Sequence, residues 1–91
     1  MKRTVFLQAE ELTDAEAAQQ YLEQAFSFPS WYGRNLDALH DCLTDISENT
    51  EIVIEGAMQM DREKGSYLDQ IIRVMDDSAD ENSCLHIYLK D

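Results

Sequence analysis

Three aspartates spaced four residues apart are the side chains in this sequence best placed to do chemistry. Asp37, Asp41 and Asp45 fall on one face of a helix that is predicted to begin near Asn35, a good N-cap residue. Like charges at this spacing oppose each other by roughly a few tenths of a kcal/mol per pair. No Lys or Arg occurs within residues 35–61 to offset them. The stripe has two interpretations: a solvated polar face, or a surface that binds a basic partner.

A turn-rich loop with two large aromatic residues precedes this helix. Trp31 and Tyr32 stand beside Gly33 and follow Pro29. Aromatic side chains in a polar setting are typical anchors of protein interfaces. We therefore expect the loop to place aromatic surface next to the carboxylates, which favours the binding interpretation.

Histidine and cysteine occur in two close pairs, which raises the question of a zinc site. His40 and Cys42 on a helix would point about 200° apart, so they cannot share an ion without distortion. Cys84 and His86 could share one face of a strand, but two ligands do not complete a site. The sequence therefore predicts no bound metal.

An enzymatic role for Cys42 is also disfavoured. A reactive thiol needs an electropositive, partly exposed surface, whereas Cys42 lies on the apolar side of an acidic helix, where its pKa should rise. The chain has no glycine-rich phosphate loop and neither a G-x-S-x-G nor an H-E-x-x-H motif. We predict a protein that is not an enzyme, has no cofactor and keeps its cysteines reduced.

The charge balance narrows the choice of partners. The 91 residues include 19 Asp and Glu against 7 Lys and Arg, a formal net charge of −12. Nucleic acids and anionic membranes are bound mainly through Lys and Arg, so direct binding to either is not expected. No cleavage-site pattern follows the N-terminus, and no stretch approaches the ~20 apolar residues that span a bilayer. We expect a single cytoplasmic domain over residues 1–91 that is monomeric when free.

The elements that must position these residues alternate between strands and helices. Strands are predicted over 4–8, 51–55 and 84–89. Helices are predicted from a capping box at Thr13 to Phe26, from Asn35 to about Ile46, over 57–64, and from Ser66 onward. The predicted outer face of the last helix carries Asp69, Arg73, Asp76 and Asp77. Crossovers of this length favour parallel pairing, so we predict an α/β fold with a small three-stranded parallel sheet and about four helices.

The segment 28–44, with the sequence FPSWYGRNLDALHDCLT, resembles the signature of the barstar family of intracellular ribonuclease inhibitors. Its centre, Tyr-Gly-x-Asn-Leu-Asp-Ala-Leu-x-Asp-Cys-Leu, is specific, and the remaining segments match the family in pattern over the whole chain. The resemblance implies the same α/β fold. It also implies an inhibitor whose second helix and preceding loop cover the active site of a basic, barnase-like ribonuclease.

The resemblance implies roles for particular residues as well. Asp41 matches an aspartate that occupies a substrate phosphate position, and Asp37 matches a second binding carboxylate. Two positions depart from the family pattern, because His40 and Ile46 replace aromatic residues. The implied partner-binding residues are Trp31, Tyr32, Gly33, Asn35, Asp37, His40, Asp41, Thr44, Asp45, Ile46 and Asp77.

Asp77 has a second interpretation. It corresponds to an acidic contact on the fourth helix of the family, but it also lies four residues after Arg73, where an ordinary surface ion pair could form.

Two functions use the same acidic face. The first is inhibition of a basic ribonuclease, in which a carboxylate on a rigid helix offers the acceptor oxygens of a phosphate without a scissile bond. The alternative is an acidic nucleic-acid mimic or regulatory binding module whose target is a basic protein without nuclease activity. The sequence does not separate the two.

Overall fold

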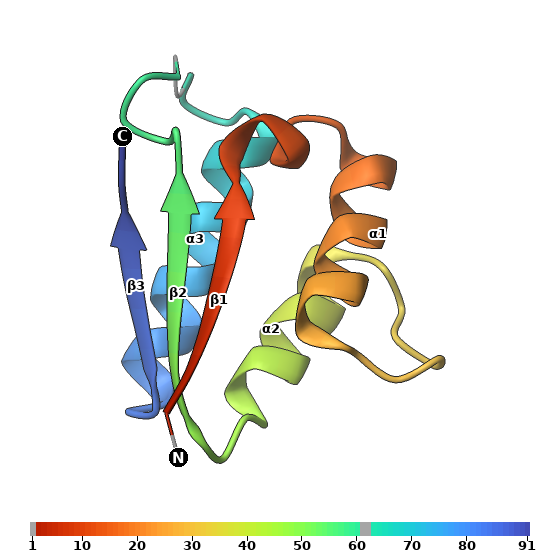
Figure 1. Ribbon diagram of the computed structural model, residues 1–91. Coiled ribbons are helices and arrows are strands. Elements are labelled where there is room, and N and C mark those ends of the chain that lie inside the picture. Colours follow the sequence, from red (N-terminus) through yellow and green to blue (C-terminus); the bar gives the residue numbers. More distant parts are fainter. Residues whose placement is uncertain (1, 61–62) are drawn as a thin grey trace.

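A three-stranded parallel sheet forms the centre of the computed structural model, which describes residues 2–60 and 63–91 (Figure 1). Its strands are β1 (Lys2–Gln8), β2 (Asn49–Glu55) and β3 (Leu85–Leu89), in the order β1-β2-β3. Both pairs are parallel, and Val5, Ile52 and Ile87 lie in register across the sheet. The predicted strands and their parallel pairing are therefore confirmed.

The helices cover one face of this sheet. They are α1 (Ala15–Phe26), α2 (Leu36–Thr44) and α3 (Tyr67–Glu81), with a short 3-10 helix, η1 (Ala9–Leu12), after β1. Figure 1 shows α3 behind the sheet and α1 and α2 beyond the β1 side. The strand residues that face the helices are buried and form the core with the apolar sides of the helices: Val5, Leu7, Ile52, Ile54 and Leu85. No described helix is long and apolar enough to cross a membrane.

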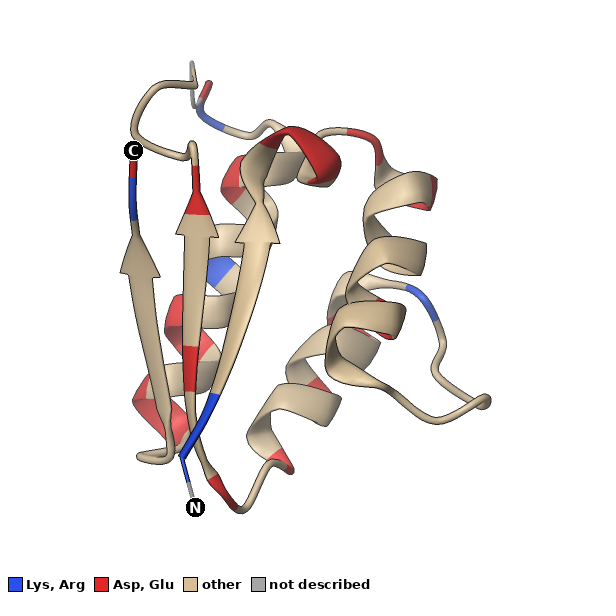
Figure 2. Cartoon of the chain, in the orientation of Figure 1, with Lys and Arg blue, Asp and Glu red and all other residues tan. Residues whose placement is uncertain are grey.

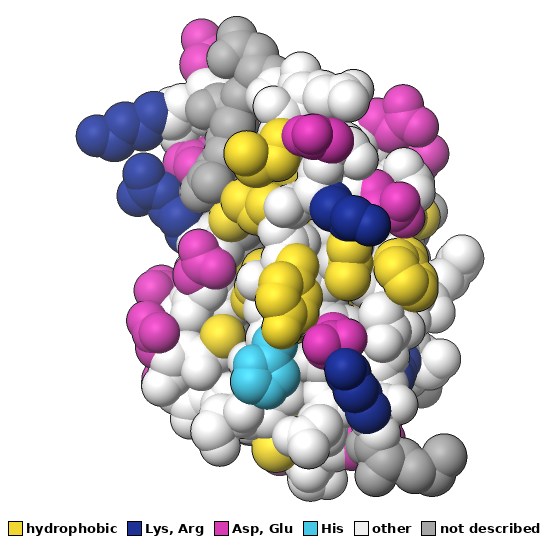
Figure 3. Space-filling model, turned by 60° about the vertical axis from the view of Figure 1, so that its left-hand side comes forward, with side chains coloured by type: hydrophobic (Ala, Val, Ile, Leu, Met, Phe, Trp, Pro, Cys, Tyr) yellow, Lys and Arg dark blue, Asp and Glu magenta, His cyan; other side chains and the backbone are white. Residues whose placement is uncertain are grey.

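The opposite face of the sheet is open to solvent. Phe6 is 61% exposed and Tyr88 is 48% exposed, and both lie in register with Val53 on the central strand. In Figure 3, which brings the β3 side of the molecule forward, hydrophobic side chains gather in the middle among acidic and basic ones. Figure 2 shows that acidic residues occur on all three helices.

Two of the three predicted N-caps are confirmed. The side chain of Asn35 accepts a hydrogen bond of 2.7 Å from the backbone N–H of Ala38. The Ser66 hydroxyl accepts one of 3.2 Å from Asp69 N–H. Each side chain satisfies an N–H that has no partner within its helix.

The capping box at Thr13 is wrong. The N-cap of α1 is Asp14, whose carboxylate accepts a hydrogen bond of 3.0 Å from the N–H of Ala17. The Thr13 hydroxyl donates instead to the carbonyl of Glu10 in η1. The helix starts one residue later because η1 occupies the segment just before it.

The sequence also predicts one helix too many. Residues 56–60 form turns and a bend, and residues 63–64 are not helical. Residues 61–62 of the predicted helix lie outside the described part of the chain. The α/β class with a three-stranded parallel sheet is confirmed, with three α-helices instead of four.

Asp69 does not lie on the outer face of α3. Its side chain is only 6% exposed, and its carboxylate accepts a hydrogen bond of 3.0 Å from Gly65 N–H and pairs with Arg73 at 3.0 Å. Gly65, two residues before α3, thus lies against this carboxylate.

Candidate functional site

Two hollows on either side of the loop 31–35 divide the three aspartates of the stripe, of which Asp37 and Asp41 lie in α2 and Asp45 caps its C-terminal end. Asp41 and Asp45 line a groove of about 510 Å³, whereas Asp37 lies at the rim of a separate cleft of about 620 Å³. All three residues are exposed. The acidic stripe predicted from the sequence therefore offers two neighbouring acidic surfaces instead of one continuous one.

The groove places an aromatic side chain beside two carboxylates. The Trp31 side chain is 77% exposed and forms part of the wall opposite α2. The Asp41 side chain is 85% exposed. A cationic group entering here would meet the face of an indole and two carboxylate groups together, both of which attract positive charge. The complete lining is Trp31, Gly33, Ala38, Asp41, Cys42 and Asp45.

Tyr32 faces the other way, which corrects the expectation of two exposed aromatic residues. It is only 5% exposed, and its ring lies against Phe28 with 4.7 Å between the ring centroids. Its hydroxyl donates a hydrogen bond to the side-chain carbonyl of Gln19, and the Gln19 amide donates to the Tyr67 hydroxyl at 2.7 Å. Burial raises the pKa of Tyr32 well above its usual range. Tyr32 thus anchors the loop to the core through buried contacts. Of the two predicted aromatic residues, only Trp31 is exposed on the loop.

Arg34 marks the turn of the loop into α2. A Cβ at Gly33, just before it, would lie about 3.4 Å from the side chains of Ala38 and Asn35, which is close van der Waals contact. Arg34 adopts a left-handed backbone conformation with φ at 52°, and its guanidinium pairs with Glu23 of α1 at 2.7 Å. The one basic residue of the loop is therefore turned toward α1 and does not neutralise the aspartates of α2.

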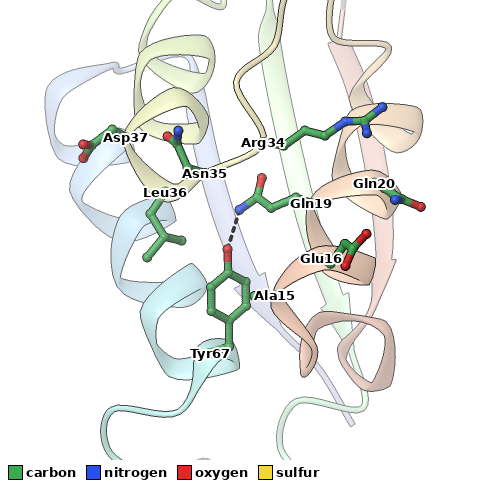
Figure 4. Close-up of a pocket in the computed structure, with 9 residues that line it drawn as sticks. All are labelled: Ala15, Glu16, Gln19, Gln20, Arg34, Asn35, Leu36, Asp37 and Tyr67. Carbon is green, nitrogen blue, oxygen red and sulfur yellow. Dashed lines mark hydrogen bonds between the residues drawn. The ribbon is translucent and has the colours of Figure 1, made fainter.

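Figure 4 shows the cleft that has Asp37 at its rim. The hydrogen-bonded pair of Gln19 and Tyr67 lies between α1 and the start of α3, Leu36 points toward Tyr67, and Asp37 points away from the cleft. Glu16 of α1 is a second carboxylate at this cleft. Its full lining is Ala15, Glu16, Gln19, Gln20, Arg34, Asn35, Leu36, Asp37 and Tyr67.

His40 connects α2 to the end of α3. Its Nε2 is hydrogen-bonded to the carboxylate of Glu81, and its Nδ1 lies 3.9 Å from Oδ1 of Asp41. The hydrogen bond to Glu81, followed by the negative charges of Glu81 and Asp41, raises the pKa of His40 above its ordinary value although partial burial acts against it.

The carboxylate of α3 that meets α2 is Glu81, which the sequence analysis did not identify. Asp77, the predicted contact, is exposed one helical turn earlier. Among the described residues, it forms no hydrogen bond or ion pair with α2. The predicted alternative partner of Asp77, Arg73, pairs with Asp69. The only sequence signal for Glu81 was its position four residues after Asp77, on the same side of α3.

Two further predicted positions have structural contacts of their own. The Thr44 hydroxyl donates to the backbone carbonyls of His40 at 2.9 Å and Asp41 at 3.1 Å, so it is engaged within α2. Ile46 is half-buried and packs against the core, and its exposed part lines a shallow hollow together with Trp31 and Asp45.

Neither cysteine forms a disulfide bond. Both are free and half-buried. Burial, together with the charges of Asp41 and Asp45, raises the pKa of Cys42, which is the direction predicted from the sequence. Among the described residues, no three His, Cys, Asp or Glu side chains are grouped as a metal site requires. The site can offer acceptor oxygens and an aromatic face, and it presents no activated nucleophile.

Comparison with known proteins places this chain in a family. The family model described as Barstar (barnase inhibitor) matches residues 2–90. A protein of Bacillus subtilis (strain 168), named "Putative ribonuclease inhibitor YrdF", is 30% identical over 80 residues, which cover 87% of this chain and 88% of that protein. The match extends through all three strands and all three helices, including the loop and helix that carry the groove. The chain therefore belongs to the barstar family of ribonuclease inhibitors.

Proposed function

We propose that this protein inhibits a basic, barnase-like ribonuclease by inserting α2 and the loop before it into the active site. The observation that carries the proposal is the groove in which the exposed carboxylate of Asp41 stands beside Trp31. The helix holds Asp41 in a fixed place, and its two oxygens can accept the hydrogen bonds that the enzyme otherwise gives to a phosphate. Inhibition in this mechanism is occupancy of the cleft, and no bond is made or broken.

The electrostatics of the chain support a cationic target. A net charge of −12 attracts a basic enzyme over distance and can raise the association rate by one to about three orders of magnitude at low salt. Those magnitudes include measurements on barnase and barstar themselves. Arg34 is held by Glu23, so it does not compete with an incoming cation. Asp45 adds a second carboxylate to the groove of Asp41, and Asp37 adds negative charge at the neighbouring cleft.

The decisive variant is Asp41→Ala. In the complex, Asp41 would be desolvated against cations of the enzyme, and its removal would leave those cations buried and unpaired, at a cost of at least about 2 kcal/mol. This cost corresponds to an affinity at least about thirtyfold weaker, expressed mainly as faster dissociation. The free protein should unfold at the same temperature as the parent, because the carboxylate is exposed to solvent.

Binding kinetics with barnase and thermal unfolding of the free variant form the test. Glu11→Ala, at an exposed position of η1 after β1, is the matched control that removes one negative charge away from the groove. An Asp41→Ala variant that binds like the parent would place the inhibitory surface elsewhere. A parent protein that neither binds nor inhibits any of a panel of basic microbial ribonucleases, barnase included, would favour a basic target without nuclease activity.

A further inference from the structure

The ring of His40 stands between two carboxylates that come from different helices. Glu81, the last residue of α3, binds Nε2, and Asp41 of α2 lies 3.9 Å from Nδ1. Among the described residues, these two carboxylates are the charged groups that face the ring, one from α3 and one from α2 itself. The His40 side chain is 34% exposed and the Asp41 side chain next to its Nδ1 is 85% exposed, so a partner can reach this pair of side chains.

The hydrogen bond to Glu81 decides which nitrogen of His40 is free. A carboxylate only accepts hydrogen bonds, so Nε2 must carry a proton to donate to it. When the ring is neutral, its single proton is therefore on Nε2, and Nδ1 presents a lone pair. The surface then has two acceptors side by side: Nδ1 of His40 and the carboxylate of Asp41, 3.9 Å apart.

We infer that Glu81 is a positioning residue for partner recognition, because it holds the His40 ring so that Nδ1 and the Asp41 carboxylate together accept hydrogen bonds from one arginine guanidinium of the partner. The inference rests on the proposed function and specifies the group that this part of the surface recognises. A guanidinium fits because it carries several N–H donors in a rigid, planar fork that can reach two separate acceptors. A lysine ammonium is a compact, strongly hydrated point charge without that fork.

This arrangement makes recognition depend on the protonation of His40. A second proton on the ring would sit on Nδ1, remove the acceptor and place a positive charge where the guanidinium must enter. Binding of the guanidinium therefore requires Nδ1 to be free of its proton. Affinity should rise with pH until the pH exceeds the pKa of His40 and should then level off. Glu81 and Asp41 raise that pKa, which moves this transition to higher pH.

NMR spectroscopy on the free full-length protein tests the inference without any ribonuclease. The probes are two blocked tripeptides, Gly-Arg-Gly and Gly-Lys-Gly, titrated at several pH values between 5 and 9 while the His40 and Asp41 signals are followed. His86 provides a second imidazole in the same spectra as an internal reference. We expect the arginine peptide to bind more tightly as pH rises, by up to about tenfold per pH unit below the His40 midpoint. At high pH, we expect the lysine peptide to bind more weakly than the arginine peptide does.

Three variants distinguish the positioning of the His40 ring by Glu81 from the general effect of one negative charge. Glu81→Gln keeps an oxygen that can accept from Nε2–H but loses the charge, so the His40 midpoint should fall while arginine binding at pH 9 stays within about twofold of the parent. Glu81→Ala should lower the midpoint and also weaken binding at pH 9, because the ring is no longer held. Asp80→Asn removes the same charge from the neighbouring exposed residue and should leave the midpoint and the affinity near parental values.

The inference is overturned if arginine binding does not change with pH, if the lysine peptide binds equally well at high pH, or if the Glu81 variants behave like Asp80→Asn. None of these results bears on Asp41→Ala with barnase. Loss of barnase binding in Asp41→Ala combined with pH-independent arginine binding would support the proposed function and reject the role of Glu81. The reverse pair of results, in which Asp41→Ala binds barnase like the parent while arginine binding depends on pH, would place the inhibitory surface elsewhere and keep the guanidinium site.

Discussion

The side-chain amide of Asn82 donates a hydrogen bond of 3.0 Å to the backbone carbonyl of Leu43. The same amide group reaches the carbonyls of Thr44 at 3.3 Å and Ile46 at 2.9 Å, so it satisfies the end of α2, where carbonyls have no partner within the helix. Its oxygen accepts from Cys84 N–H at 3.0 Å. Asn82 thereby joins the end of α2, the end of α3 and the start of β3.

Asn82→Ala should therefore destabilise the protein by about 1–3 kcal/mol, because it leaves partly buried carbonyls and one N–H without partners. Asn82→Asp should cost a similar amount, since it keeps the acceptor for Cys84 N–H but loses the donors. Urea unfolding measures the difference, and Ser83→Ala, at the next, exposed position, is the control. A parental midpoint for Asn82→Ala would show that water replaces these bonds at no cost.

The buried carboxylate of Asp69 predicts a second stability effect. Asp69→Ala should cost about 1–3 kcal/mol, because Gly65 N–H loses its acceptor and Arg73 loses its ionic partner. Asp77→Ala on the exposed side of the same helix should stay within about 0.5 kcal/mol of the parent. Thermal or urea unfolding of the two variants gives the comparison. Equal effects would mean that the burial of Asp69 has no energetic weight.

Substitutions of the two neighbouring aromatic residues of the loop should have different effects, one on binding and the other on stability. Trp31→Ala should unfold like the parent, because its side chain is largely exposed, but should weaken the ribonuclease complex by about 1 kcal/mol or more. Tyr32→Phe should destabilise the fold by about 1–3 kcal/mol, because the buried carbonyl oxygen of Gln19 loses its donor. Unfolding and binding measurements on both variants check the contrast, and it fails if Trp31→Ala unfolds early or binds normally.

The pH dependence of stability should run opposite to that of guanidinium binding. The pKa of His40 is raised in the folded state, chiefly by its hydrogen bond to Glu81, so this contact stabilises the fold fully below the unfolded value of about 6.5. That contribution is lost as pH rises through the higher folded pKa. The stability difference between the parent and His40→Gln should therefore be larger at pH 5 than at pH 9. Unfolding midpoints across this range measure it, and a difference that is constant with pH would contradict it.

Local signals in the sequence explain most of the fold. Short apolar runs rich in β-branched and aromatic residues define the strands, and the caps Asn35 and Ser66 depend only on residues within three positions. Thr13 shows the limit of such signals, because Asp14 next to it is an equally good cap and the choice between them depends on η1. The same local signals give the order of strands and helices along the chain, and the lengths of the crossovers between strands favour their parallel pairing.

Positions that depend on distant contacts could not be predicted in the same way. Helical periodicity puts Asp69 outside, but Gly65 of the preceding turn lies against its carboxylate. Either aromatic residue of the loop could have turned inward, and the partner that selects Tyr32 is Gln19, thirteen residues earlier. The sequence does not tell which turn of α3 meets α2, so it cannot distinguish Glu81 from Asp77.

The exposed position of Trp31 has an optical consequence. It is the only tryptophan in the sequence, and its indole is largely in contact with water in the free protein. Indole fluorescence shifts to shorter wavelength when water is replaced by protein. The molecule thus carries its own reporter at the wall of the groove. A tryptophan-free ribonuclease variant or a basic peptide could be titrated against this protein without any added label, and a change in emission would report contact at the groove itself.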